Sequence, residues 1–170
     1  MTIDELLKDK TIKPKDKTEI ISNWLLDDSL PVDELIVFAE NQKDPAKATC
    51  IEAMEYATRQ NPKIADENVL IFVTNTLASK APRVKWESAR LIGNIAHLFP
   101  SQLEKSIENL LINTENEGTV VRWSSAFALG EILKLKTKYN SDLLPTIETI
   151  CEKEEKNSIK KIYADALKKI

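Results

Sequence analysis

Few residues in this 170-residue chain are of the types that perform chemistry. It holds one histidine, His97, and two cysteines, Cys50 and Cys151. A metal site needs several ligands within reach of one another, and His97 has no second histidine or cysteine within helical reach. A nucleophilic Cys–His pair would need a cysteine beside His97, which nothing in their spacing favours. We therefore predict no catalytic residue, no metal site and no cofactor.

The composition of the chain excludes several further classes of protein. A phosphate-binding loop needs closely spaced glycines, but the chain has only Gly93, Gly118 and Gly130, no two closer than 12 positions. The charged share of 30% and the hydrophobic share of 42% are typical of a soluble globular chain. No apolar run reaches the roughly 20 residues of a membrane span, and the first residues lack a signal core. Two cysteines form no disulfide framework, so a cytoplasmic location is expected.

The elements that must position any site are predicted to be helices. Apolar residues recur at helical spacing, as in Val84, Leu91, Ile92 and Ile95, and hairpin signals such as Asn-Gly are missing. Capping boxes are expected where Thr2 and Ser101 each precede a glutamate by three positions. The predicted fold class is all-α, with helices over residues 2–9, 16–27, 31–42, 45–61, 64–79, 82–99, 101–115, 119–136, 141–155 and 157–169.

An internal repeat appears when the longer predicted helices are superposed. Residues 84–95 (VKWESARLIGNI) match residues 121–132 (VRWSSAFALGEI) at an offset of 37, and valine, tryptophan, serine, alanine, glycine and isoleucine coincide. Weaker copies begin at Ala48 and Ile159, at offsets of 36 and 38. A fixed period of this length is typical of stacked helical repeats, in which each unit buries its apolar face against its neighbours.

In both copies an aliphatic residue is followed by a basic residue and then by Ala-x-x-x-Gly. This pattern resembles the first helix of HEAT repeats. The resemblance covers about residues 16–170 and implies a right-handed α-α superhelix, an armadillo-type solenoid of stacked antiparallel helix pairs, with residues 1–170 as a single domain. Small residues would let successive first helices approach closely. They are Ala53, Ala89, Ala126 and Ala164, together with Gly93 and Gly130.

Trp86 and Trp123 occupy equivalent places in two adjacent repeats. They could form aromatic walls around a flipped base or a peptide. They could also be packing residues, because each shares a helical stripe with the alanine and the glycine of its own repeat. We favour the packing interpretation. Cys50 and Cys151 are likewise expected to be small buried hydrophobes.

Charge is divided unequally between the two sets of helices. The second helices of the pairs carry 13 acidic and two basic residues, whereas the first helices and the last one carry 8 acidic and 13 basic residues. Second helices line the concave surface of HEAT-like stacks, so the resemblance implies an acidic groove. Simple solvation is the other interpretation, because the helix dipole favours acidic residues near helix N-termini.

The sequence therefore predicts a non-catalytic scaffold that binds another protein, through a basic segment of that partner. An acidic groove would steer such a partner and fix its register. The last helix either seals the stack or mediates a dimer, so a monomer or weak dimer is expected. The positions expected to contact the partner are Asp66, Asn68, Glu104, Glu108, Asn109, Glu148 and Glu152.

The alternative is a DNA-binding protein. The segments that contain Trp86 and Trp123 look faintly like helices of the HEAT-like alkylpurine DNA glycosylases, which use aromatic residues, an aspartate and an arginine around a damaged nucleotide. Glu87 and Ser124 follow the two tryptophans here, so the aspartate is missing. Phosphate binding also needs clustered cations, which an acidic groove opposes. The basic residues that could touch nucleic acid are Arg83, Lys85, Arg90 and Arg122.

Overall fold

The computed structural model describes residues 1–170 and contains helices but no strands. The all-α prediction is therefore confirmed. The α-helices are α1 (Ile3–Lys8), α2 (Pro14–Leu26), α3 (Val32–Glu40), α4 (Asp44–Gln60), α5 (Glu67–Thr76), α6 (Pro82–Ile95), α7 (Glu104–Asn113), α8 (Thr119–Lys134), α9 (Asn140–Lys153) and α10 (Asn157–Leu167), and the 3-10 turns are η1 (Pro62–Ile64) and η2 (Ala96–Leu98).

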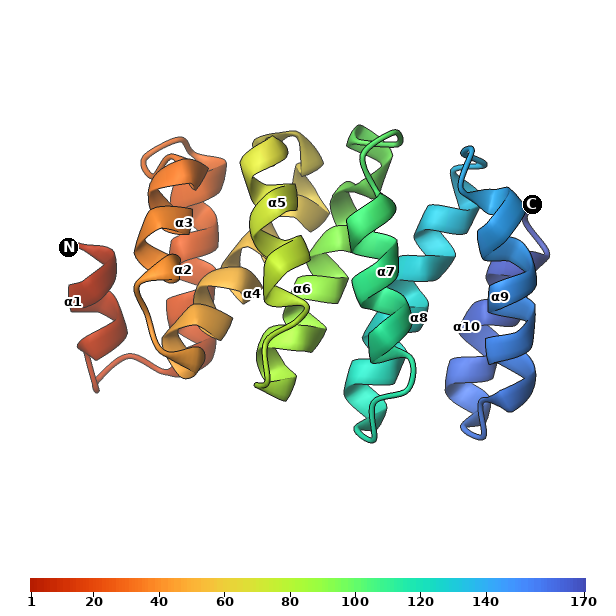
Figure 1. Cartoon of the computed structure of the whole chain (residues 1–170). Coiled ribbons are helices and arrows are strands. Elements are labelled where there is room, and N and C mark those ends of the chain that lie inside the picture. The colour runs from red at the N-terminus through yellow and green to blue at the C-terminus, as the bar shows by residue number, and fades with distance from the viewer.

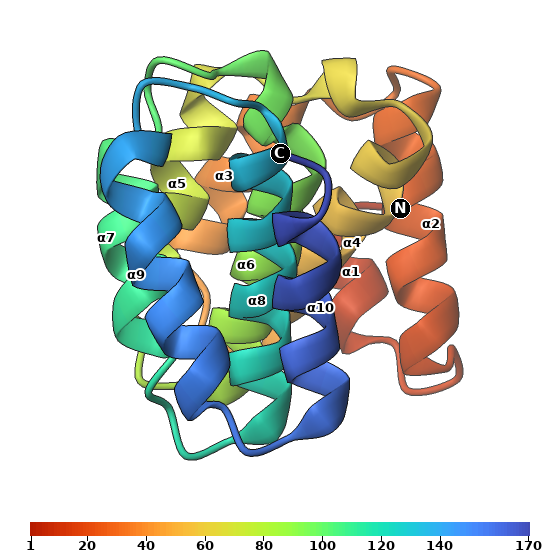
Figure 2. The ribbon, with the colours of Figure 1, turned by 90° about the vertical axis from the view of Figure 1, so that its right-hand side faces the viewer.

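After the short α1, the helices form a row of successive pairs from the N-terminal to the C-terminal end (Figure 1). The first layer consists of α2, α4, α6, α8 and α10, each of which packs closely against the next. The second layer consists of α3, α5, α7 and α9, whose helices touch one another only sparsely. Figure 2 looks along the row and shows the second layer on one side of the first. The layers thus meet along one face, while the outer face of each is free.

Small residues explain why the first layer is the tighter one. Ala53, Ala89 and Ala126 are fully buried between successive first-layer helices. A Cβ added at Gly93 would overlap the ring of Phe127, and one added at Gly130 would lie 3.3 Å from the Cβ of Ala166. The predicted role of the two mid-helix glycines in close helix packing is confirmed. Ala164, the fourth predicted alanine, is only half-buried.

The core runs through the whole row. One cluster of 39 buried hydrophobic residues extends from Ile3 to Ala166. A helix pair cannot bury its apolar stripe alone, so each pair depends on the pairs beside it.

Two predicted helix starts are wrong by three residues. The sequence signal placed a helix at residue 64, but Pro62–Ile64 is a 3-10 turn, and the side chain of Asp66 caps α5 by accepting from the backbone N–H of Val69 at 3.1 Å. At α7 the expected Ser101 capping box does not form, because Ser101 lies in a turn before the buried Leu103. The box at Thr2 and Glu5 is confirmed, with both reciprocal hydrogen bonds present.

Candidate functional site

The outer face of the second layer contains grooves between neighbouring helices. One of them lies between α3 and α5 and has a volume of about 710 Å³. Its surface includes Val37 and Ile71, which are 62% and 58% exposed, unusual for large aliphatic side chains. Asp33 and Glu40 line the same groove, together with the amide of Asn68. The groove therefore combines an apolar surface with carboxylates.

The carboxylates of this groove have no cation partner within the chain. No ion pair of the structure includes Asp33, Glu40 or Asp66. The side-chain amide of Asn68 donates a hydrogen bond to the carboxylate of Asp33 at 3.3 Å. Partial burial and the adjacent Asp33 carboxylate raise the pKa of Asp66 above its ordinary value. Lys47 is the single cation among the lining residues, so the groove retains negative charge.

A separate groove of about 450 Å³ lies between α7 and α9. Glu104 and Glu108 line it on the α7 side, and Tyr139 and Asp142 on the other. Glu108 is partly neutralised by Lys105, whose Nζ lies 3.2 Å from the carboxylate, but both side chains are well exposed. Exposed pairs of this kind contribute little to stability, so Glu108 stays free to contact another molecule.

The structure does not bring the seven predicted contact residues into one groove. Asp66 caps α5 and Asn68 lines the α3–α5 groove, whereas Glu104 and Glu108 line the α7–α9 groove. Glu148 and Glu152 are exposed on α9 outside the grooves described here. The acidic face is thus divided into separate sites.

Asn109 is the one predicted contact residue that lies inside the protein. Its side chain is only 8% exposed and donates to the backbone carbonyl of Thr74 at 2.9 Å. Nearby, the hydroxyls of Thr74 and Ser106 share a hydrogen bond of 2.6 Å, and Asn113 donates to Leu77 O at 3.1 Å. These bonds join α5 to α7. The prediction for Asn109 is corrected, because a buried amide must be hydrogen-bonded and this one serves the helix interface.

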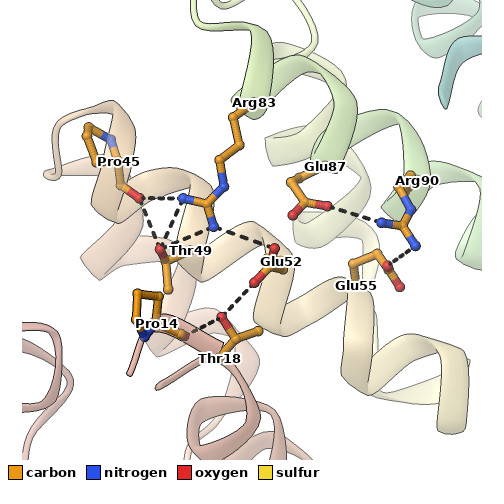
Figure 3. A network of polar contacts seen from close by, with 9 residues as sticks. All are labelled: Pro14, Thr18, Pro45, Thr49, Glu52, Glu55, Arg83, Glu87 and Arg90. Atoms are coloured by element: carbon orange, nitrogen blue, oxygen red, sulfur yellow. Dashed lines mark hydrogen bonds and ion pairs between the residues drawn. The ribbon is translucent and has the colours of Figure 1, made fainter. Parts of the chain in front are cut away.

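A second polar cluster lies in the first layer, between α4 and α6 (Figure 3). The carboxylate of Glu55 is buried and forms ion pairs with Arg90 of α6 at 3.0 Å and with Arg59 at 2.6 Å. Asn94 of α6 also donates to it at 3.2 Å. Two guanidinium groups and one amide therefore offset the charge that burial makes costly.

Glu52 and Glu87 extend this cluster. Glu52 accepts a hydrogen bond from Thr18 at 2.7 Å and pairs with Arg83 at 3.5 Å. Figure 3 shows Glu87 on α6 between the two arginines, with Arg90 3.8 Å from its carboxyl. Burial, together with the neighbouring Glu52 carboxylate, raises the pKa of Glu87 to about 8. A carboxyl group with this pKa is largely protonated at neutral pH, so Glu87 adds little negative charge beside Glu52.

None of the three carboxylates lines a groove described above. The arginines reach the surface, and the ion pairs of Arg83 and Arg90 run from α6 to carboxylates of α4, so we interpret the cluster as a polar contact that fixes α4 against α6. Sequence reasoning missed it, although Glu55 follows Ile51 by one helical turn on an apolar stripe, which was the available signal.

Four basic residues of the first layer, on α6 and α8, are bound within the chain. Arg83 and Arg90 pair with the carboxylates of Glu52 and Glu55, while Lys85 donates to Leu77 O at 3.2 Å and to Asn113 at 3.0 Å. Arg122 is held by Glu154 through two contacts of 3.1 and 3.3 Å. All four cations that were candidates for nucleic-acid contact therefore have an intramolecular role.

The aromatic residues support the packing interpretation in part. Trp86 is half-buried, whereas Trp123 is 39% exposed and stacks on Phe127, with ring centroids 6.1 Å apart and planes 10° from parallel. Phe127 in turn fills the space that Gly93 leaves open. Trp123 therefore covers a packed ring, but its outer side faces solvent.

The two cysteines and the histidine do not line the grooves described above. Cys50 is buried, as expected, and burial raises the pKa of its thiol to about 12, so it is a poor nucleophile. Cys151 is only half-buried, and its thiol donates to Lys160 O at 3.6 Å. His97 is exposed in the turn after α6.

The chain matches no protein-family model and no curated protein. The site is therefore interpreted from geometry and charge. None of the helices combines the length and the apolar character that a membrane span requires.

Proposed function

We propose that this chain is a HEAT-like α-solenoid that acts as a non-catalytic scaffold and binds a basic segment of another protein on its acidic second layer. The observation that carries the proposal is the α3–α5 groove, where exposed Val37 and Ile71 lie beside two carboxylates that form no ion pair within the chain and outnumber the single lysine of the groove. Exposed apolar surface in a polar rim is typical of protein interaction sites. A basic partner would supply the missing counter-charge and increase the association rate.

Repeated contacts support the solenoid part of the proposal. Lys85 and Arg122 hold the same place in two repeats, 37 residues apart. Lys85 donates to the carbonyl of Leu77 at the end of α5, and Arg122 donates to the carbonyls of Asn116 and Glu117 just after α7. Lys85 thus binds the C-terminal end of the preceding second-layer helix, where a cation is favoured by the dipole, and Arg122 binds the loop that follows the next second-layer helix.

The proposal is tested by reversing charge on one layer at a time. Partners are captured from nuclease-treated lysate, and the affinity of the captured protein is then measured for two variants that carry the same charge change. Asp33→Lys/Glu40→Lys alters exposed carboxylates that line the second-layer groove, and Glu19→Lys/Asp165→Lys alters exposed carboxylates of the first layer.

We expect the second-layer variant to bind about tenfold more weakly and the first-layer variant to bind like wild type, with an affinity that falls as salt increases. Equal affinities of the two variants would contradict the proposal. Retention of nucleic acid alone, in untreated lysate, would favour the DNA-binding alternative instead.

A further inference from the structure

The arrangement of charge along α3 indicates what the α3–α5 groove can hold. Asp33 and Glu40 both line the groove and lie seven positions apart on α3, which is about 10.5 Å along the helix axis at 1.5 Å per residue. Val37, 62% exposed, lies between them on the same helix, and Ile71 of α5 lines the groove as well. The groove therefore presents negative charge, an aliphatic surface and negative charge again over two helical turns.

Resting on the proposed function, we infer that this groove binds one amphipathic helix of the partner, with two basic residues seven positions apart and aliphatic residues between them. The spacing of cations on such a helix equals the spacing of Asp33 and Glu40, because both follow the same rise per residue. Its aliphatic residues, at the third and fourth positions between the cations, would cover Val37 and Ile71.

A helical occupant satisfies the groove better than an extended one. The groove lies between two helices, whose backbone N–H and C=O groups are already paired within α3 and α5, so its walls offer no free strand edge. An extended peptide would lose hydrogen bonds to water without replacing them, whereas a helix pairs its own backbone groups.

Charge favours the same occupant at the Asp33 end. Asp66 lies beside Asp33, and this neighbour together with partial burial raises the pKa of Asp66. Two carboxylates there share no cation of the chain, so an incoming ammonium or guanidinium group would relieve their repulsion. Lys47 is the only cation that lines the groove, so Asp33 and Glu40 leave it with net negative charge, and these two carboxylates would repel a partner with acidic residues at the corresponding places.

The inference is tested with two synthetic alanine-rich helical peptides of identical composition, each with two lysines and two leucines. In the matched peptide the lysines are seven positions apart and flank the leucines; in the scrambled peptide the lysines are adjacent. Affinity is measured by fluorescence anisotropy on the full chain, and the binding site is mapped from the methyl NMR signals of Val37 and Ile71.

We expect the matched peptide to bind about tenfold more tightly than the scrambled one and to shift both methyl signals. Asp33→Asn/Glu40→Gln should remove this preference. Ile112→Ser, which alters a 68% exposed aliphatic residue of α7, should retain it. Circular dichroism checks that both variants keep the wild-type helix content.

Four results would overturn the inference. Equal binding of both peptides would exclude recognition of the cation spacing, and equal binding of a matched peptide with a central proline would exclude a helical occupant. Shifts at Leu111 of the α7–α9 groove in place of Val37 would move the site while leaving the proposed function intact. If neither peptide binds, the groove inference fails, whereas the proposed function fails only if the layer-specific charge reversals also have no effect.

Discussion

At the scale of single residues, the buried carboxylates of the first layer are stabilised in two different ways. Glu55 is surrounded by two arginines and one amide, while burial and the neighbouring Glu52 raise the pKa of Glu87. The three neighbouring carboxyl groups are thus balanced by three guanidinium groups, and the proton on Glu87 relieves its repulsion from Glu52. The contact between α4 and α6 therefore depends on pH.

The protonated state of Glu87 predicts a pH-dependent stability. Between its ordinary pKa of 4.5 and its folded pKa of about 8, the folded chain holds a proton that the unfolded chain releases, so the free energy of unfolding falls as pH rises through this range. Glu87→Gln, which mimics the protonated group, should flatten this dependence and be more stable than wild type by roughly 1–3 kcal/mol at about pH 9. Urea unfolding at several pH values measures it. A Glu87→Gln profile parallel to that of wild type would contradict the prediction.

The lowered pKa of Glu154 predicts a pH dependence of stability with the opposite sign. Burial alone would raise its pKa, but the hydrogen bonds from Arg122 and from the backbone of Lys156 outweigh this and lower the pKa below its ordinary value. The stability that this pair provides is present above about pH 4.5 and is lost as pH falls through the folded pKa. Glu154→Gln should therefore destabilise the chain by roughly 2–4 kcal/mol at neutral pH and by much less in acid.

The control for this prediction is Glu155→Gln, a change at the adjacent, exposed carboxylate. It should stay within about 0.5 kcal/mol of wild type in the same urea titration. An equal loss in both variants would show that Arg122 is not specifically paired.

At the scale of helices, the close contact between α6 and α8 depends on Gly93, which has no side chain. Glycine in a helix interior costs about 1 kcal/mol relative to alanine, so Gly93→Ala would stabilise an isolated helix. Here the added Cβ would overlap the Phe127 ring, and the stacked Trp123 limits how far that ring can move. We expect Gly93→Ala to destabilise the chain by about 1–3 kcal/mol.

Gly130→Ala provides the matched comparison, since its Cβ would meet only the Cβ of Ala166, at 3.3 Å. Its cost in thermal unfolding should be clearly smaller than that of Gly93→Ala. The double variant Gly93→Ala/Phe127→Leu should recover part of the loss, because a smaller side chain leaves room for the new methyl group. A stabilising Gly93→Ala would disprove the close-approach explanation.

At the scale of the whole molecule, stability is distributed unevenly along the row. The central helices α4, α6 and α8 contact neighbours on both sides, whereas α9 buries only Leu143 and Ile147 and contains Pro145 within its helix. In a stack of this kind each element is stabilised by its nearest neighbours, so the ends open more readily. We expect amide hydrogen exchange to be slowest in α6 and faster by at least about tenfold in α1 and α9. Mass spectrometry of exchanged fragments measures this, and uniform protection along the chain would argue against stepwise opening.

The sequence by itself determined the helices and their repeat. Periodic apolar residues, prolines and the Thr2 cap act over a few residues, so all ten helices could be predicted. The largest errors in their bounds are at the starts of α5 and α7, three residues early, and at the ends of α5 and α6, which were placed at residues 79 and 99 but lie at Thr76 and Ile95. The packing role of Gly93 and Gly130 could also be predicted, because a glycine within a strong helix signal already implies a close neighbour. The unequal charge of the two layers follows from composition once the helix pairs are assigned.

Only the tertiary structure decided which of these residues meet. The pairing of Arg90 with Glu55, the burial of Asn109 and the exposure of Val37 and Ile71 depend on how far each helix stands from the next and how it is rotated about its axis. Those quantities are set by side-chain packing between segments some 35 residues apart, which no local pattern records. The same cause divides the acidic residues among separate grooves, because the closely packed first layer leaves the second-layer helices spread apart.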